Sequence, residues 1–295
     1  MTSNNAEHSS AAHSADWATA AALRLRVEEA SLNAWPALQQ VLLDGWILRF
    51  ARGFTKRSNS IVPLYANAGR READNNPPLL DGVLSKVRHC ENLYAREQLR
   101  TVFRLSDIHP DTGYVDPDSP GQNEHQTSQA HINLDTLLEK RGYAHQDPSL
   151  VLCKRLTDTA KPSTEVAQME LDDWLNCYAE LTNVDATARK LHAYILRNIT
   201  TETGFFVLKK AEHPQACLMA VLDRNLVGIF DVFTHPQARG LGLATQTLNT
   251  AFFWAAEKGA EIAYLQVVQD NTPAIELYRR LGFQKSYTYW YRVGS

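Results

Sequence analysis

The stretch that decides the fold reads Gln237-Ala238-Arg239-Gly240-Leu241-Gly242-Leu243-Ala244, and it runs directly into a long apolar-periodic segment ending near Gly259. A strand-like run at 229–233 precedes it. A strand, a glycine-bearing turn and a helix start, in this order, form an anion site because the first N–H groups of a helix have no intrahelical partner. The two glycines let backbone approach a ligand without a Cβ in the way. The pattern predicts that backbone N–H groups from Arg239 to Ala244 cradle a phosphate.

A second motif follows one helix and one strand later: Asn271-Thr272-Pro273-Ala274-Ile275-Glu276-Leu277-Tyr278-Arg279-Arg280-Leu281-Gly282-Phe283. The two motifs together resemble the GNAT superfamily of acyl-CoA N-acyltransferases, in which Gln or Arg followed by x-x-G-x-G/A binds a pyrophosphate. The resemblance implies an α/β fold with a central mixed, mostly antiparallel sheet flanked by helices. It also implies acetyl-CoA as the cosubstrate, with no metal.

The resemblance assigns roles to several residues. Tyr278 falls where the family has its proton donor, and a phenol with a pKa of about 10 can protonate a leaving thiolate at neutral pH. Asn271 falls where the family has an amide that contacts the pantetheine arm, although Asn is also a common helix N-cap. The oxyanion donor is expected at a main-chain N–H where the family's fourth and fifth strands splay. The expected cofactor-binding residues are therefore Phe233, Thr234, Arg239, Gly240, Leu241, Gly242, Leu243, Ala244 and Asn271.

The general base is harder to assign. Some family members carry a Glu five residues before the motif's Asn, but that position here is Gln266, which takes no proton at neutral pH. Asp231 lies inside an apolar strand pattern, where a charge is costly unless it is paired or functional. The alternative is a carboxylate that faces outward at a strand edge. Strand alternation predicts that Asp231 shares its side with Ile229 and Phe233, opposite Phe230 and Val232.

Three other sources of a base stay open. Asp185 lies in the loop 182–185, which in the family covers the acceptor site, and Asp270 adjoins Asn271. A chain of water molecules to bulk solvent is the third. His235 precedes Pro236 in a turn that is more often structural than catalytic.

An internal sequence repeat predicts two tandem GNAT-like domains. Residues 137–143 align with 277–283 when the glycines at the helix ends are matched, and the strands 99–105 and 262–268 precede them in the same order. A duplication accounts for both, although any helix that ends in Leu-x-x-x-Gly-aromatic looks similar. The predicted organisation is a disordered tail (1–16), a GNAT-like domain (17–156), a linker (157–164) and a catalytic GNAT domain (165–295).

The first half is degenerate in its motifs. Where the second half has its phosphate turn, the first half has Pro77-Pro78, and proline supplies no N–H. Leu138 stands at the position that matches Tyr278. This half is expected to be structural or to shape the acceptor pocket. Its stretch 46–65, which includes the segment 53–60, resembles the first half of uncharacterised tandem GNAT proteins from bacteria.

Periodicity predicts the remaining elements. Helices are expected at 18–32, 37–43, 79–96, 134–143, 171–181, 186–199, 243–258 and 274–281. Strands are expected at 46–50, 60–65, 99–105, 150–156, 165–170, 205–209, 216–222, 227–233, 262–268 and 287–293. The polar stretch 106–130 is a lid, a disordered excursion or a docking surface. The last strand stands alone where the family usually has two, so its neighbour is missing, or comes from the other half or another chain.

Composition limits the functional classes. A net charge of −3 lacks the basic footprint of a nucleic-acid-binding protein. The four cysteines are widely spaced, which argues against a zinc site or a disulfide framework and favours a reducing cytosol. There is no signal-peptide pattern and no apolar run of about 18 residues, so we expect a cytoplasmic protein, monomeric or homodimeric, that binds neither membrane nor nucleic acid.

These observations predict an N-acetyltransferase that moves acetyl from acetyl-CoA to a primary amine of a small molecule by direct attack in a ternary complex. The competing class is a non-catalytic sensor that binds acyl-CoA or a metabolite. The acceptor itself stays open between aminoglycosides, amino acids, polyamines and protein N-termini.

Overall fold

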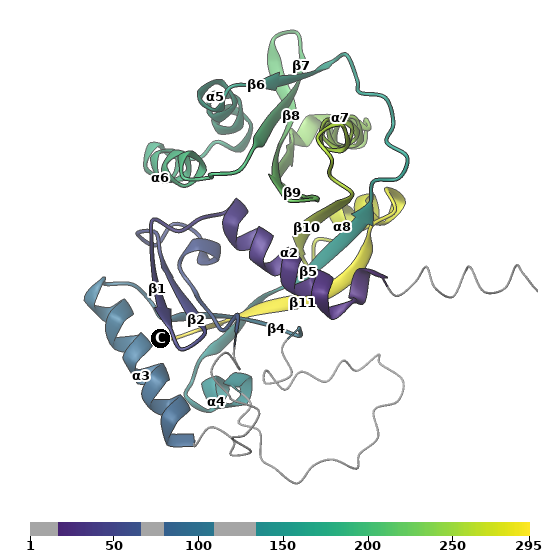
Figure 1. The fold of residues 1–295 in the computed structure, drawn as a ribbon. Helices are drawn as coiled ribbons and strands as arrows, with labels where there is room; N and C mark the ends of the chain where they lie inside the picture. Colours follow the sequence, from purple (N-terminus) through teal and green to yellow (C-terminus); the bar gives the residue numbers. More distant parts are fainter. Residues whose placement is uncertain (1–16, 66–79, 109–133) are drawn as a thin grey trace, which may run out of the picture. The chain divides into compact units, whose positions relative to one another are not determined.

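The computed structural model describes residues 17–65, 80–108 and 134–295 (Figure 1). The predicted tail 1–16, the proline turn of the first half and most of the predicted loop 106–130 lie outside these residues. The chain forms two compact units. Unit 1 comprises Met1–Pro36 and Leu150–Tyr287, and unit 2 comprises Ala37–Ser149 and Thr288–Ser295.

Unit 1 is built on a mixed sheet. Its strands lie in the order β5 (Ala144–Arg155), β10 (Ile262–Val268), β9 (Leu226–Thr234), β8 (His213–Asp223), β7 (Thr203–Lys210) and β6 (Val166–Met169). Strands β6 to β9 form an antiparallel meander, and β10 runs parallel to β9. The antiparallel meander agrees with the prediction because each of its strands is short, apolar and bounded by a turn.

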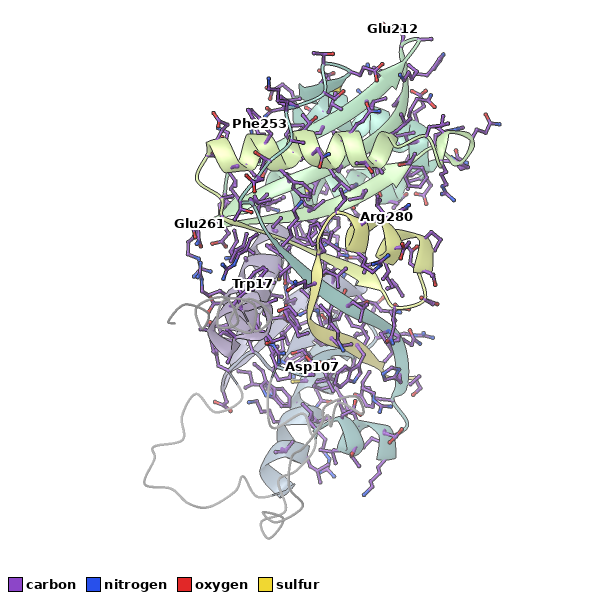
Figure 2. The ribbon with its side chains drawn as sticks, turned by 90° about the vertical axis from the view of Figure 1, so that its right-hand side faces the viewer. Trp17, Asp107, Glu212, Phe253, Glu261 and Arg280 are labelled. Carbon is purple, nitrogen blue, oxygen red and sulfur yellow. The ribbon has the colours of Figure 1, made fainter. Side chains whose placement is uncertain are left out.

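Helices cover both faces of this sheet. Helices α5 (Leu171–Thr182) and α6 (Ala186–Arg197) lie on one side of β7 to β9, and α7 (Leu243–Glu257) lies on the other (Figure 1). Helix α8 (Thr272–Arg280) lies with α7 in front of the strands in Figure 2, where Phe253 and Arg280 mark the two helices. Leu248, Ala251 and Phe252 of α7 are buried against the strands and form the core of the unit.

The first long helix, α2 (Ala21–Ala34), also belongs to unit 1. Its predicted apolar positions Leu23, Val27 and Ala30 are buried. Glu28 is buried as well, and its carboxylate accepts a hydrogen bond from the Tyr287 hydroxyl at 2.6 Å. The helix therefore completes a unit whose other residues lie more than a hundred positions further along the chain.

Unit 2 contains β1 (Gln39–Leu43), β2 (Trp46–Phe50), β3 (Ile61–Val62) and β4 (Val102–Ser106), followed in the sheet by β11 (Gln284–Val293). Helices α3 (Leu80–Arg96) and α4 (Leu134–Lys140) flank them. The core is made by strand residues such as Leu48 and Phe103 packed against Tyr94 of α3 and Leu138 of α4. Short 3₁₀ turns at Trp17–Thr19, Lys56–Ser58 and Pro236–Ala238 complete the two units.

The predicted helix at 37–43 is wrong, because this segment is strand β1. It pairs antiparallel with β2, and Leu43 stands opposite Trp46 across a two-residue turn. Asp44 and Gly45 in that turn have φ values of 43° and 80°. Two positive φ values are the requirement of a tight hairpin turn, for which Asp-Gly is a preferred pair. The preference of Asp44-Gly45 for a tight hairpin turn therefore outweighed the helix that Pro36 indicated.

Each half of the chain ends in a strand that passes from one unit to the other. Strand β5 begins in unit 2 and enters unit 1 at Leu150, and β11 begins in unit 1 and enters unit 2 at Thr288. Within unit 2, Tyr289–Val293 pair antiparallel with Val102–Ser106 of β4. The first half of the chain thus provides a neighbour for the last strand. The predicted boundaries 17–156 and 165–295 follow the duplication, whereas the compact units exchange α2 and these strand ends.

Candidate active site

The glycine turn joins β9 to α7. Gly240 and Gly242 both have positive φ (80° and 76°), and nothing lies within 4 Å of where a Cβ on either would stand. Gly242 is the N-cap of α7, and Leu243, the first helical residue, is buried while Leu241 is 67% exposed. The Arg239 side chain donates back to the Thr234 carbonyl oxygen at 3.4 Å. The open surface above a helix N-terminus fits the pyrophosphate of coenzyme A.

Strands β9 and β10 separate at the end of β9 that leads into this turn. Their parallel pairing joins Leu226–Ile229 with Ile262–Leu265 and stops there, although β9 continues to Thr234 and β10 to Val268. On its other edge β9 still pairs with β8, where Phe233 faces Cys217 and Thr234 faces Ala216. The end of β9 therefore lies beyond its pairing with β10, and this part of the strand contains Phe233 and Thr234, the residues expected to lie near the oxyanion donor.

A β-bulge interrupts β9 at Asp231. Between Cys217 and Met219 of β8 the register shifts, so that Asp231 and Val232 together stand opposite Leu218. Asp231 has a φ of 50°, in the left-handed region that Asp tolerates better than most residues.

The predicted alternation around Asp231 is wrong because of this bulge. The ring of Phe230 lies 6.3 Å from that of Trp35, which in turn lies 5.4 Å from the His192 ring, and Asp231 also contacts His192. Phe230 and Asp231 thus face the same cluster. Ile229 and Val232 pack instead into the core that holds α7.

The carboxylate of Asp231 pairs with a histidine that the sequence analysis did not single out. His192 Nε2 lies 2.9 Å from Asp231 Oδ2, and the side chains are 5% and 13% exposed. Helix α6 presents His192 on its buried face, next to Ala193. The one signal in the sequence was a polar residue on the apolar face of a predicted helix, and the pairing spans 39 positions.

Tyr278 lies on α8, where the motif predicted it. It is 6% exposed, it packs edge-on against Phe283 at a ring distance of 5.8 Å, and burial raises its pKa to about 12. The phenol therefore stays protonated throughout the physiological pH range, which a proton donor requires. Tyr278 belongs to the core that also contains residues of α7, whereas Asp231 contacts His192 of α6.

The other polar candidates have structural partners. The Asn271 side chain caps α8 by accepting from the Ala274 N–H at 3.3 Å. Asp185 caps α6 by accepting from the N–H groups of Thr187 and Ala188 at 2.8 and 2.9 Å. Capping does not prevent contact with a ligand, but it accounts for both residue types without one.

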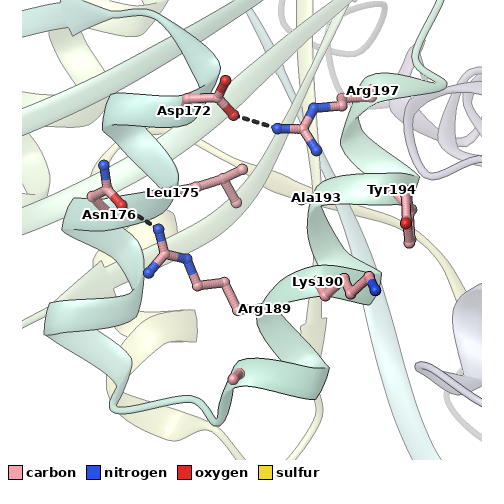
Figure 3. Close-up of a pocket in the computed structure, with 9 residues that line it drawn as sticks. Asp172, Leu175, Asn176, Arg189, Lys190, Ala193, Tyr194 and Arg197 are labelled. Carbon is pink, nitrogen blue, oxygen red and sulfur yellow. Dashed lines mark hydrogen bonds and ion pairs between the residues drawn. The ribbon is translucent and has the colours of Figure 1, made fainter.

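A groove of about 460 Å³ lies between α5 and α6 (Figure 3). Asp172 pairs with Arg197 and Asn176 with Arg189 across it, so these bonds join the two helices. Both residues of the Asp172–Arg197 pair are more than half exposed, and such pairs contribute at most about 1 kcal/mol. Neither Asp231 nor the glycine turn lines the groove, so we separate it from the candidate active site.

Within the described ranges no group of His, Cys, Asp and Glu side chains has metal-binding geometry, and no helix is long and apolar enough to cross a membrane. All four cysteines are described, and each is buried and free. Burial, with a further contribution from the Asp231 charge, raises the pKa of the Cys217 thiol well above its ordinary value. Cys217 therefore does not compete with Asp231 as a base.

A glycine turn at a helix start, a bulged strand and a splayed parallel pair define a domain with the GNAT fold. Residues 166–283 match the description "Acetyltransferase (GNAT) family", and this part of the chain belongs to that family. Residues 20–104 match a second description, "Probable histone acetyltransferase Rv0428c C-terminal".

Relatives extend the similarity over most of the chain. The uncharacterized N-acetyltransferase YobR of Bacillus subtilis is 22% identical over 269 residues, which are 91% of this chain and 97% of that protein. The uncharacterized N-acetyltransferase MJ1207 of Methanocaldococcus jannaschii is 35% identical over 91 residues, which are 28% and 40% of the two chains.

Two solved structures share the fold. A GCN5-related N-acetyltransferase from Kribbella flavida superposes with a TM-score of 0.61 at 15% identity, covering 92% of this chain and 96% of its own. A tandem GNAT protein from the clavulanic acid biosynthesis pathway superposes with a TM-score of 0.53 at 13% identity, and the superposition covers 77% of this chain and 72% of that protein. The predicted fold, a mixed sheet flanked by helices in a tandem GNAT arrangement, is confirmed.

Proposed function

We propose that unit 1 transfers acetyl from acetyl-CoA to a primary amine of a small molecule by direct attack in a ternary complex. The observation that carries the proposal is the glycine turn, which offers open space and unpaired helix N–H groups beside the splayed end of β9. Bound acetyl-CoA supplies the thioester that the amine attacks and the sulfur that leaves. In this arrangement the N–H groups from Gly240 to Ala244 hold the pyrophosphate, because the Arg239 N–H already donates to the Pro236 carbonyl oxygen.

Main-chain N–H groups near Phe233 or Thr234 then face the carbonyl oxygen as negative charge develops on it. One well-aimed donor of this kind lowers the barrier by about 3 to 4 kcal/mol. The edge of β9 is suited to this task because its pairing with β10 ends at Ile229.

Two protons leave the ammonium nitrogen as it becomes an amide. Asp231 accepts the first, which frees the lone pair for attack, and later releases it to solvent. Tyr278 gives its phenolic proton to the departing sulfur and recovers a proton from the nitrogen. The assignment of Tyr278 as the acid is supported by its raised pKa of about 12, which keeps it protonated.

Thiol release from acetyl-CoA across a panel of amines tests the proposal. An aminoglycoside, an amino acid, a polyamine and a peptide N-terminus represent the open acceptor classes, and mass spectrometry of the product identifies the acetylated nitrogen. Tyr278→Phe is expected to bind acetyl-CoA normally but to turn over 10²- to 10⁴-fold more slowly, the range for a lost general acid. Tight acetyl-CoA binding without thiol release for any amine would instead favour a non-catalytic sensor.

A further inference from the structure

We infer that His192 is a positioning residue, whose Nε2–H holds the Asp231 carboxylate so that its remaining oxygen meets an acceptor that arrives as a protonated alkylamine. The inference rests on the proposed function, because it concerns how the acceptor is received. It adds a residue that belongs to neither sequence motif, and it defines the acceptor class by charge.

The hydrogen bond has one possible direction when Asp231 is ionised. A carboxylate accepts but does not donate, so Nε2, 2.9 Å from Oδ2, carries the proton. One lone pair of Oδ2 is thereby used, and Oδ1 stays available. The carboxylate is the more exposed partner, with 13% of its side chain exposed against 5% for His192.

Three aromatic rings keep the imidazole in place. The rings of Trp35, Trp174 and Tyr178 lie 5.4, 6.1 and 5.0 Å from it. Trp174 is fully buried and Trp35 is 3% exposed. An imidazole packed in this way cannot swing toward a substrate, and its contribution is to fix what it binds.

The backbone gives Asp231 a reason to need such support. Its φ of 50° is costly for a residue with a Cβ, and it occurs inside a strand where the neighbours are extended. The bulge turns the side chain toward α6, and the bond to His192 then fixes the carboxylate at that point. A misplacement of about 1 Å can cost about 100-fold in rate, so a positioning residue has a measurable effect.

The pair has a defined electrostatic setting. Tyr178 of α5 and Cys217 of β8 are titratable residues that lie against the pair. Burial keeps the Cys217 thiol protonated. Asp231 is thus the carboxylate that an alkylammonium ion meets, and the proton passes from the nitrogen to Oδ1 as the N–H bond breaks and an O–H bond forms.

Two amide substitutions of different length test the inference. In His192→Gln the amide nitrogen reaches about as far as Nε2 and still donates, whereas in His192→Asn the same group is too short. With an alkylamine acceptor, we expect His192→Asn to lower kcat/KM for the amine by about 10- to 100-fold. We expect His192→Gln to stay within about 5-fold of the original protein, and KM for acetyl-CoA to remain unchanged in both. Tyr194→Phe, on the exposed side of the same helix, is the matched control.

The Asp231→Asn background separates positioning from a merely structural role. In the Asp231→Asn background, we expect His192→Asn to lower kcat/KM for the amine by less than about 2-fold further. The reason is that the effect of His192 acts through the carboxylate, which this background lacks. An equal loss in both backgrounds, a failure of Gln to rescue, or full activity of His192→Asn would overturn the inference while the amine acetylation itself persists. Absence of thiol release by the original protein with every amine would instead overturn the proposed function, and this inference with it.

Discussion

Gly242 is the residue of the glycine turn on which we expect coenzyme A binding to depend. Its φ of 76° is one that a β-branched residue rarely adopts, and a side chain there would occupy the open space in front of α7. We expect Gly242→Val to reduce coenzyme A affinity by at least 100-fold in isothermal titration calorimetry.

The chain offers a matched control for this substitution. Gly259, just beyond the other end of α7, has a φ of 87° and equally open surroundings. Gly259→Val imposes the same kind of backbone cost away from the turn, so it should lower the melting temperature and leave coenzyme A affinity unchanged. Equal affinities in the two folded variants would contradict the site assignment.

Tyr278 makes the stability of unit 1 sensitive to alkaline pH. Its folded-state pKa of about 12 lies above the ordinary value of about 10, so the folded protein holds this proton more tightly than the unfolded chain. The associated stability is complete below about pH 10 and is lost as the pH rises to about 12, a change of roughly 3 kcal/mol for a shift of two pKa units.

Urea unfolding at pH 8, 10 and 11 measures this contribution. We expect the free energy of unfolding to fall less steeply with pH in Tyr278→Phe than in the original protein. Other buried tyrosines, among them Tyr94, have raised pKa values too, and they affect both proteins equally. Parallel pH curves would show that the phenol is not desolvated.

At the level of elements, β9 depends on a glycine just before its bulge. A Cβ on Gly228 would lie 2.5 Å from the hydroxyl oxygen of Tyr264 and 2.6 Å from a ring carbon of Phe230, and Tyr264 is fully buried. We expect Gly228→Ala to destabilise the protein by about 1 to 3 kcal/mol, the usual cost of overpacking.

Gly82 of α3 provides the comparison. It lies inside a helix, and nothing is within 4 Å of its Cβ position, so Gly82→Ala should stabilise by up to about 1 kcal/mol through helix propensity. Chemical denaturation of Gly228→Ala and Gly82→Ala measures the change in the free energy of unfolding, which we expect to be negative for the first variant and positive for the second. A neutral Gly228→Ala would mean that Tyr264 moves aside at little cost.

The elements also show which parts of the site a sequence can predict. The glycine turn and the second motif depend on residues close together in the chain, and helices α7 and α8 begin at or within two residues of the predicted positions. The His192–Asp231 pair joins residues 39 positions apart, and the bulge at Asp231 depends on β8 as much as on β9. A period-two pattern assumes a regular strand, so it assigned the wrong side to Phe230.

On the scale of the whole chain, we predict one coenzyme A per molecule, bound by the second half. The first half has Pro77-Pro78 where the second half has its glycines, and proline has no N–H to offer a phosphate. Calorimetric titration should give a stoichiometry of one for the original protein and none for Gly242→Val. A stoichiometry of two in the original protein, or one site of undiminished affinity in Gly242→Val, would show that the first half retains a site.

The duplication could be predicted from the chain because both halves end in the same helix-glycine-aromatic pattern. The exchange of α2 and of the ends of β5 and β11 could not, since periodicity reports which face of an element is buried but not what it is buried against. The same limit applies to β1, whose pairing with β2 outweighed its local helix signal.

The exchange has a consequence for synthesis on the ribosome. Helix α2 is synthesised long before the residues that it packs against: Glu28 accepts a hydrogen bond from the Tyr287 hydroxyl, 259 positions further along the chain. Unit 2 likewise includes Thr288–Ser295, whose strand residues pair with β4. Unit 1 can therefore complete its core only after Tyr287 has been synthesised, and until then the apolar face of α2 lacks the residues that bury it. A product that stops before Tyr287 lacks pieces of both units at once, so it exposes apolar surface that each complete unit buries.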